Sequence, residues 1–522
     1  MGALSSSLSA ATIPPSLDAP IVSRNPATGQ VLGEVPSASA DEVRAAVARA
    51  RAAQVDWARV PVRERARRVL AFRDEITTRA EEVIDLLVRE GGKTRSEALG
   101  MELVVVVDLA TYFAKRAEKI LAAQPIAMHL LKNKKSYVHF VPRGVVGVIA
   151  PWNFPFSIPL GETFMALIAG NAVVVKPSEV TPLIALKAKE LFDACGLPRD
   201  LFQVVTGRGA TGSALIESGV DQIVFTGSVA TGKKVAAACG ERLLPCIVEL
   251  GGKAPAIVCA DADLERTANA LVWGAFANSG QVCASVERVY AHEAVHDELV
   301  RKIVAKTQAL RQGDPSHDVD VGAMTWDRQL AIVEDRVKSA VAAGARVATG
   351  GKRGGAGASG NRTGSAEGMF FEPTVLTDCR QDMDVMRREV FGPVMPIMKV
   401  RSEDDAIGLA NDSELGLCGY VFTKDREKGR RMAERIECGT VMVNDVLFTY
   451  GAPETPWLGV KNSALGFTHS DDGLRELCQR RHVNVDRISG KSEIWWYPYS
   501  QKTFGRLLAG IRLLFRPKRR NA

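Results

Sequence analysis

From Val145 onward the chain alternates short runs rich in valine and isoleucine with longer segments whose apolar residues recur at helical spacing. The strand-like runs cover residues 145–149, 172–175, 202–205, 222–225 and 246–249. Short apolar strands that alternate with helices predict a parallel sheet with helices on both faces, so the expected fold class is α/β.

A second alternating region follows Ala254. Its strand-like runs cover residues 256–259, 286–291, 394–400, 420–423 and 441–444. Upstream of both regions, residues 41–68 and 71–99 have helical apolar spacing, and the glycine-rich residues 350–360 are expected to form a surface loop. The pattern contains no internal repeat and predicts a further α/β domain after the first.

The composition excludes several other classes of protein. Hydrophobic residues make up 46% of the 522 residues, which rules out a disordered chain. Nine cysteines without a C-x-x-C pair argue against a disulfide scaffold or a metal site and fit a reducing, cytoplasmic compartment. The N-terminus lacks the layout of a signal peptide, and prolines interrupt the longest apolar stretch, residues 144–175, so no membrane span is expected.

Two glycine-rich segments resemble phosphate-binding loops. The segment from Gly227 to Lys234 nearly matches a P-loop, but Lys234 stands where a magnesium-binding Ser or Thr is required, which argues against a P-loop NTPase. The segment 207–212 matches G-x-G-x-x-G but lacks the acidic residue expected about 20 residues later. Because a glycine turn into a helix exposes N–H groups to an anion, the Gly227 turn is the predicted pyrophosphate site.

Three polar residues could carry covalent chemistry beside this turn. Cys283 follows the polar sequence Asn-Ser-Gly-Gln, which can present a thiol nucleophile to a cleft. Glu249 ends an apolar strand before two glycines and is a candidate general base, although a simple salt bridge to Lys253 is the alternative interpretation. Asn153 lies between prolines in a rigid turn, where its amide could donate to an oxyanion.

These motifs, in this order, resemble those of the aldehyde dehydrogenase superfamily, and the resemblance covers about residues 24–485. The matching segments are Asn25-Pro-Ala-Thr-Gly29, Pro151–Pro155, Lys176-Pro-Ser-Glu179, Phe225-Thr-Gly-Ser228 with Gly232, Glu249-Leu-Gly-Gly252, the Cys283 loop and Glu389-Val-Phe391-Gly-Pro393. The resemblance implies the aldehyde dehydrogenase fold, in which a Rossmann-like domain, an α/β catalytic domain and a small oligomerisation strand unit combine.

The resemblance also implies the reaction and the role of each site residue. Cys283 would attack the aldehyde carbonyl, Asn153 and the Cys283 N–H would hold the oxyanion, and Glu249 would activate water to release the acid from a thioester. The presence of Glu249 argues against a branch of the family that forms coenzyme A esters. The expected cofactor is NAD, with NADP as the second choice, because the Glu179 carboxylate would accept from a ribose 2′-OH and repel a 2′-phosphate. The residues implied to bind it are Trp152, Lys176, Glu179, Phe225, Gly227, Ser228, Gly232, Leu250, Glu389 and Phe391.

Two departures from the family pattern lie close to the expected site. Glu162 stands where many members carry a lysine, and the run Ser463–Thr468 lacks the usual Arg and Glu. Because of these changes, the substrate of a relative is not assigned to this chain. Phe154, Ile158 and Trp457 are the predicted apolar walls of the substrate pocket.

The C-terminal tail extends beyond the resemblance. Residues 491–522 carry eight cations and one acid and so account for the whole net charge of +7. Apolar residues between Phe504 and Phe515 fall on one helical face after the aromatic run 494–499, and the apolar run is too short to span a bilayer. Residues 494–520 are therefore predicted to lie on an anionic membrane, with docking on a sister subunit as the alternative and no nucleic-acid partner expected.

The expected organisation follows from these segments. It comprises a flexible arm at 1–20, an NAD-binding domain at 21–124 and 143–250, a catalytic domain at 251–450, oligomerisation strands at 125–142 and 479–487, and the tail at 488–522. Met1-Gly2 with Ser6 also matches a short myristoylation pattern. The protein is predicted to be a homodimer or homotetramer that oxidises an aldehyde. If the tail binds a membrane, a long-chain or lipid-derived aldehyde is the expected substrate. The alternative is a catalytically idle, membrane-associated scaffold with the same fold.

Overall fold

The computed structural model describes residues 19–354, 362–363, 368–488 and 490–515, and it divides the chain into two units. Unit 1 comprises Met1–Leu121 and Val141–Gln479, and unit 2 comprises Ala122–Phe140 and Arg480–Ala522. Most of the predicted N-terminal arm, the myristoylation pattern, most of the glycine-rich loop and the basic run 516–520 lie outside the described residues.

The first sheet of unit 1 has six strands in the order β22-β9-β8-β5-β6-β7. Its parallel strands are β5 (Val145–Ile149), β6 (Ala172–Lys176), β7 (Phe202–Val204), β8 (Gln222–Thr226) and β9 (Cys246–Glu249). The short strand β22 (Ala464–Leu465) adds an antiparallel edge, in which Ala464 pairs with Glu249. All five strands predicted for the first region are confirmed, because continuous apolar runs of β-branched residues suit a sheet that is buried on both faces.

Helices cover both faces of this sheet. They include α1 (Ala40–Trp57), α2 (Val62–Thr78), α3 (Ala80–Gly91), α5 (Val104–Ile120), α6 (Ser157–Ala169), α7 (Pro182–Ala194), α8 (Gly209–Glu217) and α9 (Val229–Glu241). Every residue of α6 is buried. The two continuous helical segments expected over 41–68 and 71–99 are wrong in their boundaries, since Pro61 and Arg79 separate α1, α2 and α3. Proline has no N–H with which to continue a helix, so the chain restarts at Pro61.

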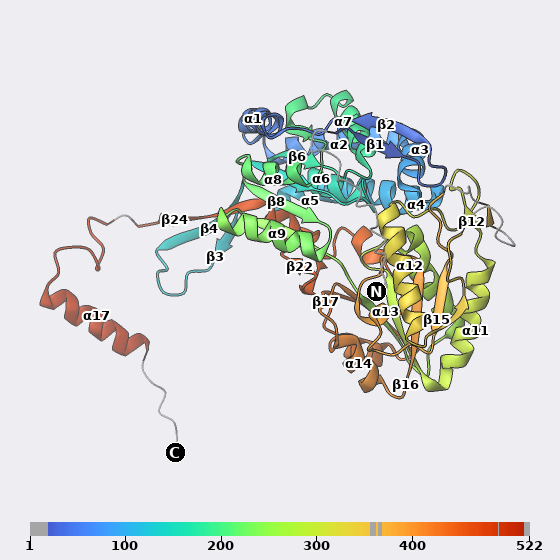
Figure 1. Ribbon diagram of the computed structural model, residues 1–522. Helices are drawn as coiled ribbons and strands as arrows, with labels where there is room; N and C mark the ends of the chain where they lie inside the picture. The colour runs from blue at the N-terminus through green and yellow to red at the C-terminus, as the bar shows by residue number, and fades with distance from the viewer. Residues whose placement is uncertain (1–18, 355–361, 364–367, 489, 516–522) are drawn as a thin grey trace, which may run out of the picture. The chain divides into compact units, whose positions relative to one another are not determined.

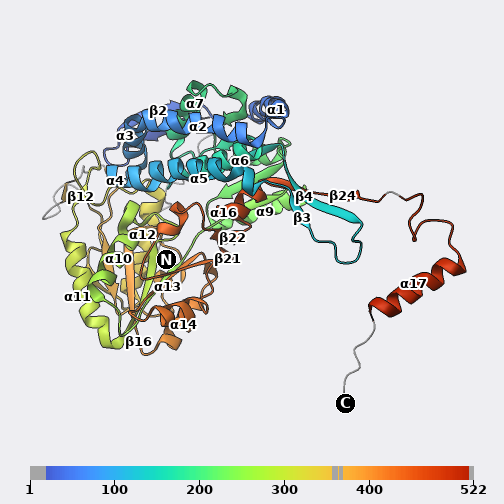
Figure 2. The same cartoon turned by 180° about the vertical axis from the view of Figure 1, so that it is seen from behind.

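The second sheet of unit 1 has seven strands in the order β13-β15-β16-β11-β10-β18-β19. The strands are β10 (Ala254–Val258), β11 (Val286–His292), β13 (Arg346–Thr349), β15 (Thr374–Thr377), β16 (Val394–Val400), β18 (Cys418–Phe422) and β19 (Thr440–Val443). Only β13 runs antiparallel to its neighbour. The helices α10 (Leu264–Phe276), α11 (Glu293–Ala309), α12 (Asp327–Ala342), α14 (Glu403–Asn411) and α15 (Arg426–Ala433) accompany it, and Figures 1 and 2 show the two sheets of unit 1 as two lobes.

The chain passes from one sheet to the other through Leu250–Lys253. Glu249 is the last residue of β9, and β10 begins at Ala254, after four intervening residues. The interpretation of Glu249 as a partner of Lys253 is wrong, because Lys253 Nζ instead forms a buried ion pair with Glu287 at 2.5 Å. Glu249 therefore stands at the junction of the two sheets, and no described Lys, Arg or His forms an ion pair with it.

A π-helical turn, η1 (Ala98–Leu103), joins the short helix α4 (Arg95–Glu97) to α5. Thr94 caps α4 and forms a reciprocal capping box with Glu97. Single π-turns inside α-helices occur frequently at functional sites.

Unit 2 contains a three-stranded sheet and one helix. The strands β3 (Gln124–Ile126), β4 (Lys134–Pro142) and β24 (Cys478–Asp486) lie in the order β24-β4-β3, and Ser136 Oγ donates to Asn484 Oδ1 at 2.8 Å. The predicted tail helix is present as α17 (Gln501–Leu514), and none of its residues is buried. Across the described ranges, no helix is both long and apolar enough to cross a membrane.

Candidate active site

The loop that carries Cys283 is built from an unusual backbone turn. After α10, Asn278 and Ser279 adopt left-handed φ values of 51° and 54°, and Gly280 follows at 72°. A Cβ at Gly252 would overlap the backbone oxygen of Cys283, so only glycine allows the loop after Glu249 to approach the thiol this closely. The structure thus brings the ends of β9 and α10 together.

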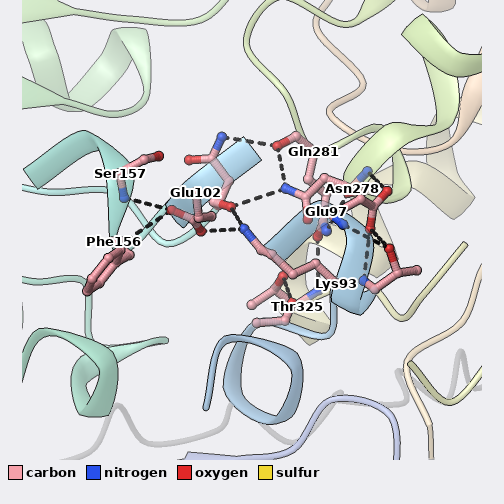
Figure 3. A network of polar contacts seen from close by, with 11 residues as sticks. Lys93, Glu97, Glu102, Phe156, Ser157, Asn278, Gln281 and Thr325 are labelled. Atoms are coloured by element: carbon pink, nitrogen blue, oxygen red, sulfur yellow. Dashed lines mark hydrogen bonds and ion pairs between the residues drawn. The ribbon is translucent and has the colours of Figure 1, made fainter. Parts of the chain in front are cut away.

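A buried ion pair lies beneath this loop (Figure 3). Lys93 Nζ contacts Glu102 Oε1 at 2.5 Å, and both side chains are at most 1% exposed. The same ammonium donates to the backbone oxygen of Asn153 at 2.8 Å. Glu102 Oε2 accepts from the backbone N–H of Ser157 at 2.7 Å, which fixes the start of α6.

A second set of hydrogen bonds joins the Asn153 turn to the Cys283 loop (Figure 3). Glu97 Oε1 accepts from the Asn278 N–H at 2.7 Å, and Asn278 Nδ2 donates to the backbone oxygen of Asn153 at 3.1 Å. Gln281 Oε1 accepts from the Thr325 N–H at 2.9 Å. A buried polar network of this kind holds the two loops in one arrangement.

The Asn153 amide lies directly against the Cys283 loop. Its Nδ2 donates to the Gln281 backbone oxygen at 3.0 Å, two residues before Cys283, and the side chain is buried. A carboxamide has two hydrogens, so this contact fixes the orientation of the amide while a second N–H remains to meet a developing oxyanion.

The thiol of Cys283 is neutral in these surroundings. Burial raises the pKa of Cys283 first, and the negative charges of Glu249 and Glu389 raise it further. Its conversion to a nucleophile therefore needs a neighbouring group that accepts the proton.

Glu249 has the properties of such a group. It is buried, and burial together with the charge of Glu162 raises its pKa well above the ordinary carboxyl value, while the Trp457 indole opposes the shift. Its Oε1 has no hydrogen-bond partner within the described ranges. An acid whose pKa is raised toward neutrality is suited to general base catalysis.

Cys283 opens into a cavity of about 600 Å³. Phe154, Ile158 and Trp457 line it as predicted, and the other apolar walls are Met101, Val104, Val105, Trp273, Leu447, Phe448 and Tyr450. The charged residues of the lining are all acidic: Glu97, Asp108 and Glu454. No lysine, arginine or histidine is among the lining residues that the structure describes.

The residues expected to bind a dinucleotide follow the carboxyl ends of the first sheet. Trp152 follows β5, Lys176 ends β6, and Ser228 caps α9 directly after β8. This edge of an open parallel sheet is where ligands bind in doubly wound folds, and the N-terminus of α9 offers backbone N–H groups to a phosphate.

Close contacts shape this edge for a flat ligand. A Cβ at Gly227 would meet the Phe225 ring at 2.7 Å, and Gly232 packs on the side chain of Leu250. Lys176 Nζ contacts Glu179 Oε2 at 3.4 Å. The donor set and the missing Cβ atoms fit a dinucleotide.

The residues expected at the nicotinamide end, Glu389 and Phe391, lie in the loop before β16 of the second sheet. Glu389 Oε1 accepts from the Gly252 N–H at 2.9 Å, and the Phe391 ring lies edge-on to Trp152 with centroids 5.4 Å apart. Burial and the charge of Glu287 raise the pKa of Glu389 to about 8. Among the described residues, no group of His, Cys, Asp or Glu side chains is arranged to hold a metal ion.

Residues 14–483 match the model of the aldehyde dehydrogenase family. The chain belongs to this family. It is accordingly an oxidoreductase that acts on aldehydes, and its α/β architecture is the aldehyde dehydrogenase fold.

Among its curated relatives, a Mycolicibacterium smegmatis protein with the provisional name succinate-semialdehyde dehydrogenase (NADP+) is 39% identical over 88% of both chains. A Methylomonas protein named 4,4'-diapolycopene aldehyde oxidase is 36% identical over 92% of this chain and 88% of its own.

Solved aldehyde dehydrogenases have the same fold. Lactaldehyde dehydrogenase from Escherichia coli superimposes with a TM-score of 0.84 at 34% identity, over 90% of this chain and 96% of its own. An aldehyde dehydrogenase from Mycobacterium tuberculosis complexed with NAD+ superimposes with a TM-score of 0.84 at 35% identity. The match covers 90% of this chain and 95% of that chain. Relatives of this aldehyde dehydrogenase thus use NAD or NADP, as their names state.

Sequence reasoning missed the residues that support the site. Lys93, Glu97 and Glu102 were not among the predicted functional residues, although two local signals were present. Thr94-x-x-Glu97 is a capping-box pattern, and Glu102 is a lone charge at the start of an apolar helix.

Proposed function

We propose that this aldehyde dehydrogenase oxidises an uncharged, apolar aldehyde to the carboxylic acid with NAD. The acid-lined, otherwise apolar cavity that receives Cys283 is the observation that carries the choice of substrate. Succinate semialdehyde carries a second carboxylate, and a buried carboxylate requires a cationic or hydrogen-bonding partner. The described lining offers no cation, and its three acidic side chains would repel a second carboxylate, so the activity named for the Mycolicibacterium relative is not the one that this cavity favours.

The chemistry that we assign to the chain begins at Cys283. Glu249 takes the thiol proton as the sulfur forms a bond to the aldehyde carbon, and the carbonyl oxygen becomes an oxyanion held by Asn153 Nδ2 and the Cys283 N–H. Bound NAD supplies the hydride acceptor that allows the adduct to become a thioester. After Glu249 has released the first proton to solvent, it removes a proton from water, and the hydroxide adds to the thioester carbon. The C–S bond then breaks, and the proton held by Glu249 returns to the sulfur, which releases the acid and the thiol.

The first test is the rate of nicotinamide reduction with straight-chain aldehydes of increasing length and with succinate semialdehyde. We expect kcat/KM to rise with chain length and to be lowest for the semialdehyde. Cys283→Ala should abolish the activity, whereas Cys195→Ala, at another partly accessible cysteine, should preserve it. Efficient oxidation of succinate semialdehyde, or activity in Cys283→Ala, would contradict the proposal.

Silence with every aldehyde would instead favour the idle scaffold, provided that the protein also fails to bind NAD. The chain keeps Cys283, Glu249 and Asn153, and Cys283 lines the cavity while Asn153 is bonded to the Cys283 loop, which argues against that alternative.

The NAD preference rests on Glu179. Its carboxylate, close to Lys176 at the end of β6, would accept from a ribose 2′-OH and repel a 2′-phosphate. Serine removes the negative charge that would repel a 2′-phosphate, so we expect Glu179→Ser to raise kcat/KM for NADP relative to kcat/KM for NAD. NADP is the cofactor in the names of several relatives. An unchanged cofactor ratio would show that Glu179 does not select the cofactor.

We further propose that the tail places the enzyme on anionic membranes. The apolar side chains of Phe504, Leu507 and Ile511 are 63%, 42% and 57% exposed, and they share one face of α17. Lys502 and Arg506 lie on the opposite side, as a helix lying in a lipid interface requires. Unit 2 strands 125–142 and 479–487 remain the proposed oligomerisation surface.

Vesicle sedimentation tests the membrane proposal. Full-length protein should bind vesicles that contain phosphatidylserine, and Ile511→Asp should release it. Leu513→Asp is the matched control, because Leu513 is 79% exposed and lies outside the apolar face. Equal binding of the two variants, or no binding by the unaltered protein, would refute the proposal.

A further inference from the structure

Glu162 is a buried carboxyl with only one hydrogen-bonding partner in the described structure. It lies within α6, is 3% exposed, and its Oε1 accepts from Thr468 Oγ1 at 2.6 Å. Its Oε2 is buried and has no hydrogen bond within the described ranges. Leaving such an atom unsatisfied costs free energy, so an unpaired oxygen beside an active site calls for an explanation.

The sheet register brings the segment that leads to Thr468 alongside β9, the strand that ends at Glu249. Leu465 and Ala464 of β22 pair with Val248 and Glu249, and the chain then turns at Gly466, which has φ 82°. It continues into β23 (Phe467–Thr468), where Thr468 pairs with Trp457 of β20 (Trp457–Leu458). The hydroxyl that holds Glu162 and the proposed base Glu249 are thus positioned by one hairpin.

No cation balances these two carboxyls. Neither Glu162 nor Glu249 forms an ion pair among the described residues, and each keeps one buried oxygen without a hydrogen bond. The other titratable groups around them are Tyr450, Cys283, Cys418, His469 and Glu102, and Glu102 is paired with Lys93. Tyr450 and Cys283 are uncharged at neutral pH, and burial lowers the pKa of His469 to about 4, so it is neutral too. Two carboxylates cannot both be ionised cheaply in such a site.

We propose that Glu162 and Glu249 act as a coupled pair that holds one proton between them, so that Glu162 controls when the base Glu249 is ionised. This inference rests on the proposed role of Glu249. Glu162 is a positioning residue, because it acts on the reaction only through Glu249.

The electrostatics of the pair agree with this arrangement. Burial raises the pKa of Glu162 to about 7 against the opposing hydrogen bond from Thr468. The charge of Glu162 in turn raises the pKa of Glu249. Two carboxyls that repel each other in a buried site titrate in two steps that belong to the pair.

The test is the pH dependence of kcat/KM for an apolar aldehyde. Glu162→Gln removes the neighbouring negative charge, so Glu249 should ionise more readily and the acid limb of the profile should move down by about 1 pH unit or more. Glu90→Gln is the matched control. Glu90 is another buried carboxyl whose pKa burial raises to about 7, and it is bonded to Ser23, Leu183 and Ile184, away from this site. Its removal should leave the acid limb in place.

Thr468→Val provides a second variant with almost the same shape. Loss of the hydroxyl donor favours protonated Glu162, so the acid limb should again move down, by less than in Glu162→Gln. Because the hydroxyl acts only through Glu162, the shift should vanish when Thr468→Val is added to Glu162→Gln. An acid limb that stays in place in folded Thr468→Val and Glu162→Gln would overturn the inference.

A direct measurement separates this inference from the proposed function. The infrared band of buried protonated carboxyls at neutral pH should lose intensity in Glu162→Gln. If Glu249→Gln keeps full activity, the assignment of the base fails. If Glu249→Gln is inactive but Glu162→Gln changes neither the profile nor the band, the base stands and the coupled pair is refuted.

Discussion

Replacing Lys93 by methionine should destabilise the protein by about 3–5 kcal/mol, the usual cost of removing one partner of a buried ion pair. The methionine side chain nearly fills the same volume, so the loss comes from the missing ammonium. Glu102, which is completely buried, would be left with backbone N–H groups as its remaining partners, and the Asn153 backbone oxygen would lose one of two donors.

A second substitution shows whether the charge is the cause. In Lys93→Met/Glu102→Gln the buried charge is gone, while the amide oxygen can still accept from the Ser157 N–H. The remaining cost is that of imperfect hydrogen bonding, about 1–3 kcal/mol, so the double variant should recover about 2 kcal/mol. Arg59→Met is the surface control. The Arg59–Asp56 pair is 75% and 87% exposed, and its loss should cost less than about 1 kcal/mol.

Urea unfolding followed by tryptophan fluorescence measures these differences. All variants are compared at one protein concentration. The quantity compared is the urea midpoint of unfolding, because large chains often unfold in more than one step. A loss below about 1 kcal/mol for Lys93→Met, or a double variant no more stable than the single one, would refute the reasoning. The kcat of Lys93→Met should also fall, because the ammonium supports the Asn153 turn.

Two further outcomes are expected. Gly252→Ala should lower kcat at least about tenfold because its Cβ would overlap the Cys283 backbone oxygen. Gly240→Ala is the control, because Gly240 lies in a helix with open space around it, and this variant should preserve activity and slightly raise stability. Steady-state kinetics compares the kcat of the two variants. Acidification should destabilise the protein through His469. Its folded pKa of about 4 lies below the ordinary 6.5, so the stability that it contributes is present above pH 6.5 and is lost as the pH falls through 4, by about 3 kcal/mol. The fall in urea midpoint between pH 7 and pH 4 should therefore be smaller in His469→Phe, and equal falls would contradict this assignment.

The strands and the reaction class could be predicted from local patterns, whereas the supporting contacts could not. A continuous apolar run such as residues 172–175 encodes a buried strand by itself. Lys253 could not be paired correctly, because its partner Glu287 lies 34 residues away and no local rule selects it over Glu249. The contact of Glu162 with Thr468 spans 306 residues and depends on a hairpin that brings Thr468 to the sheet.

The pattern around residues 41–99 failed for a different reason. Helical spacing continues across Pro61 because buried residues recur at intervals of three and four in both α1 and α2, but the backbone cannot continue there. Periodicity reports which side of a segment faces the core and does not report where hydrogen bonding stops.

The π-helical turn η1 also limits how this protein can evolve. In a regular α-helix, residues five apart point about 140° away from each other, whereas i→i+5 bonding brings them toward one side. Glu97 and Glu102 are five apart and flank or occupy this turn, and Gly100 and Met101 of the same turn line the cavity. Losing one residue here would reshape the aldehyde cavity and separate the two carboxylates in the same step. Lineages that keep both glutamates should therefore keep the segment's length, and their substrate range should diversify through side-chain replacement instead of through insertions or deletions at this turn.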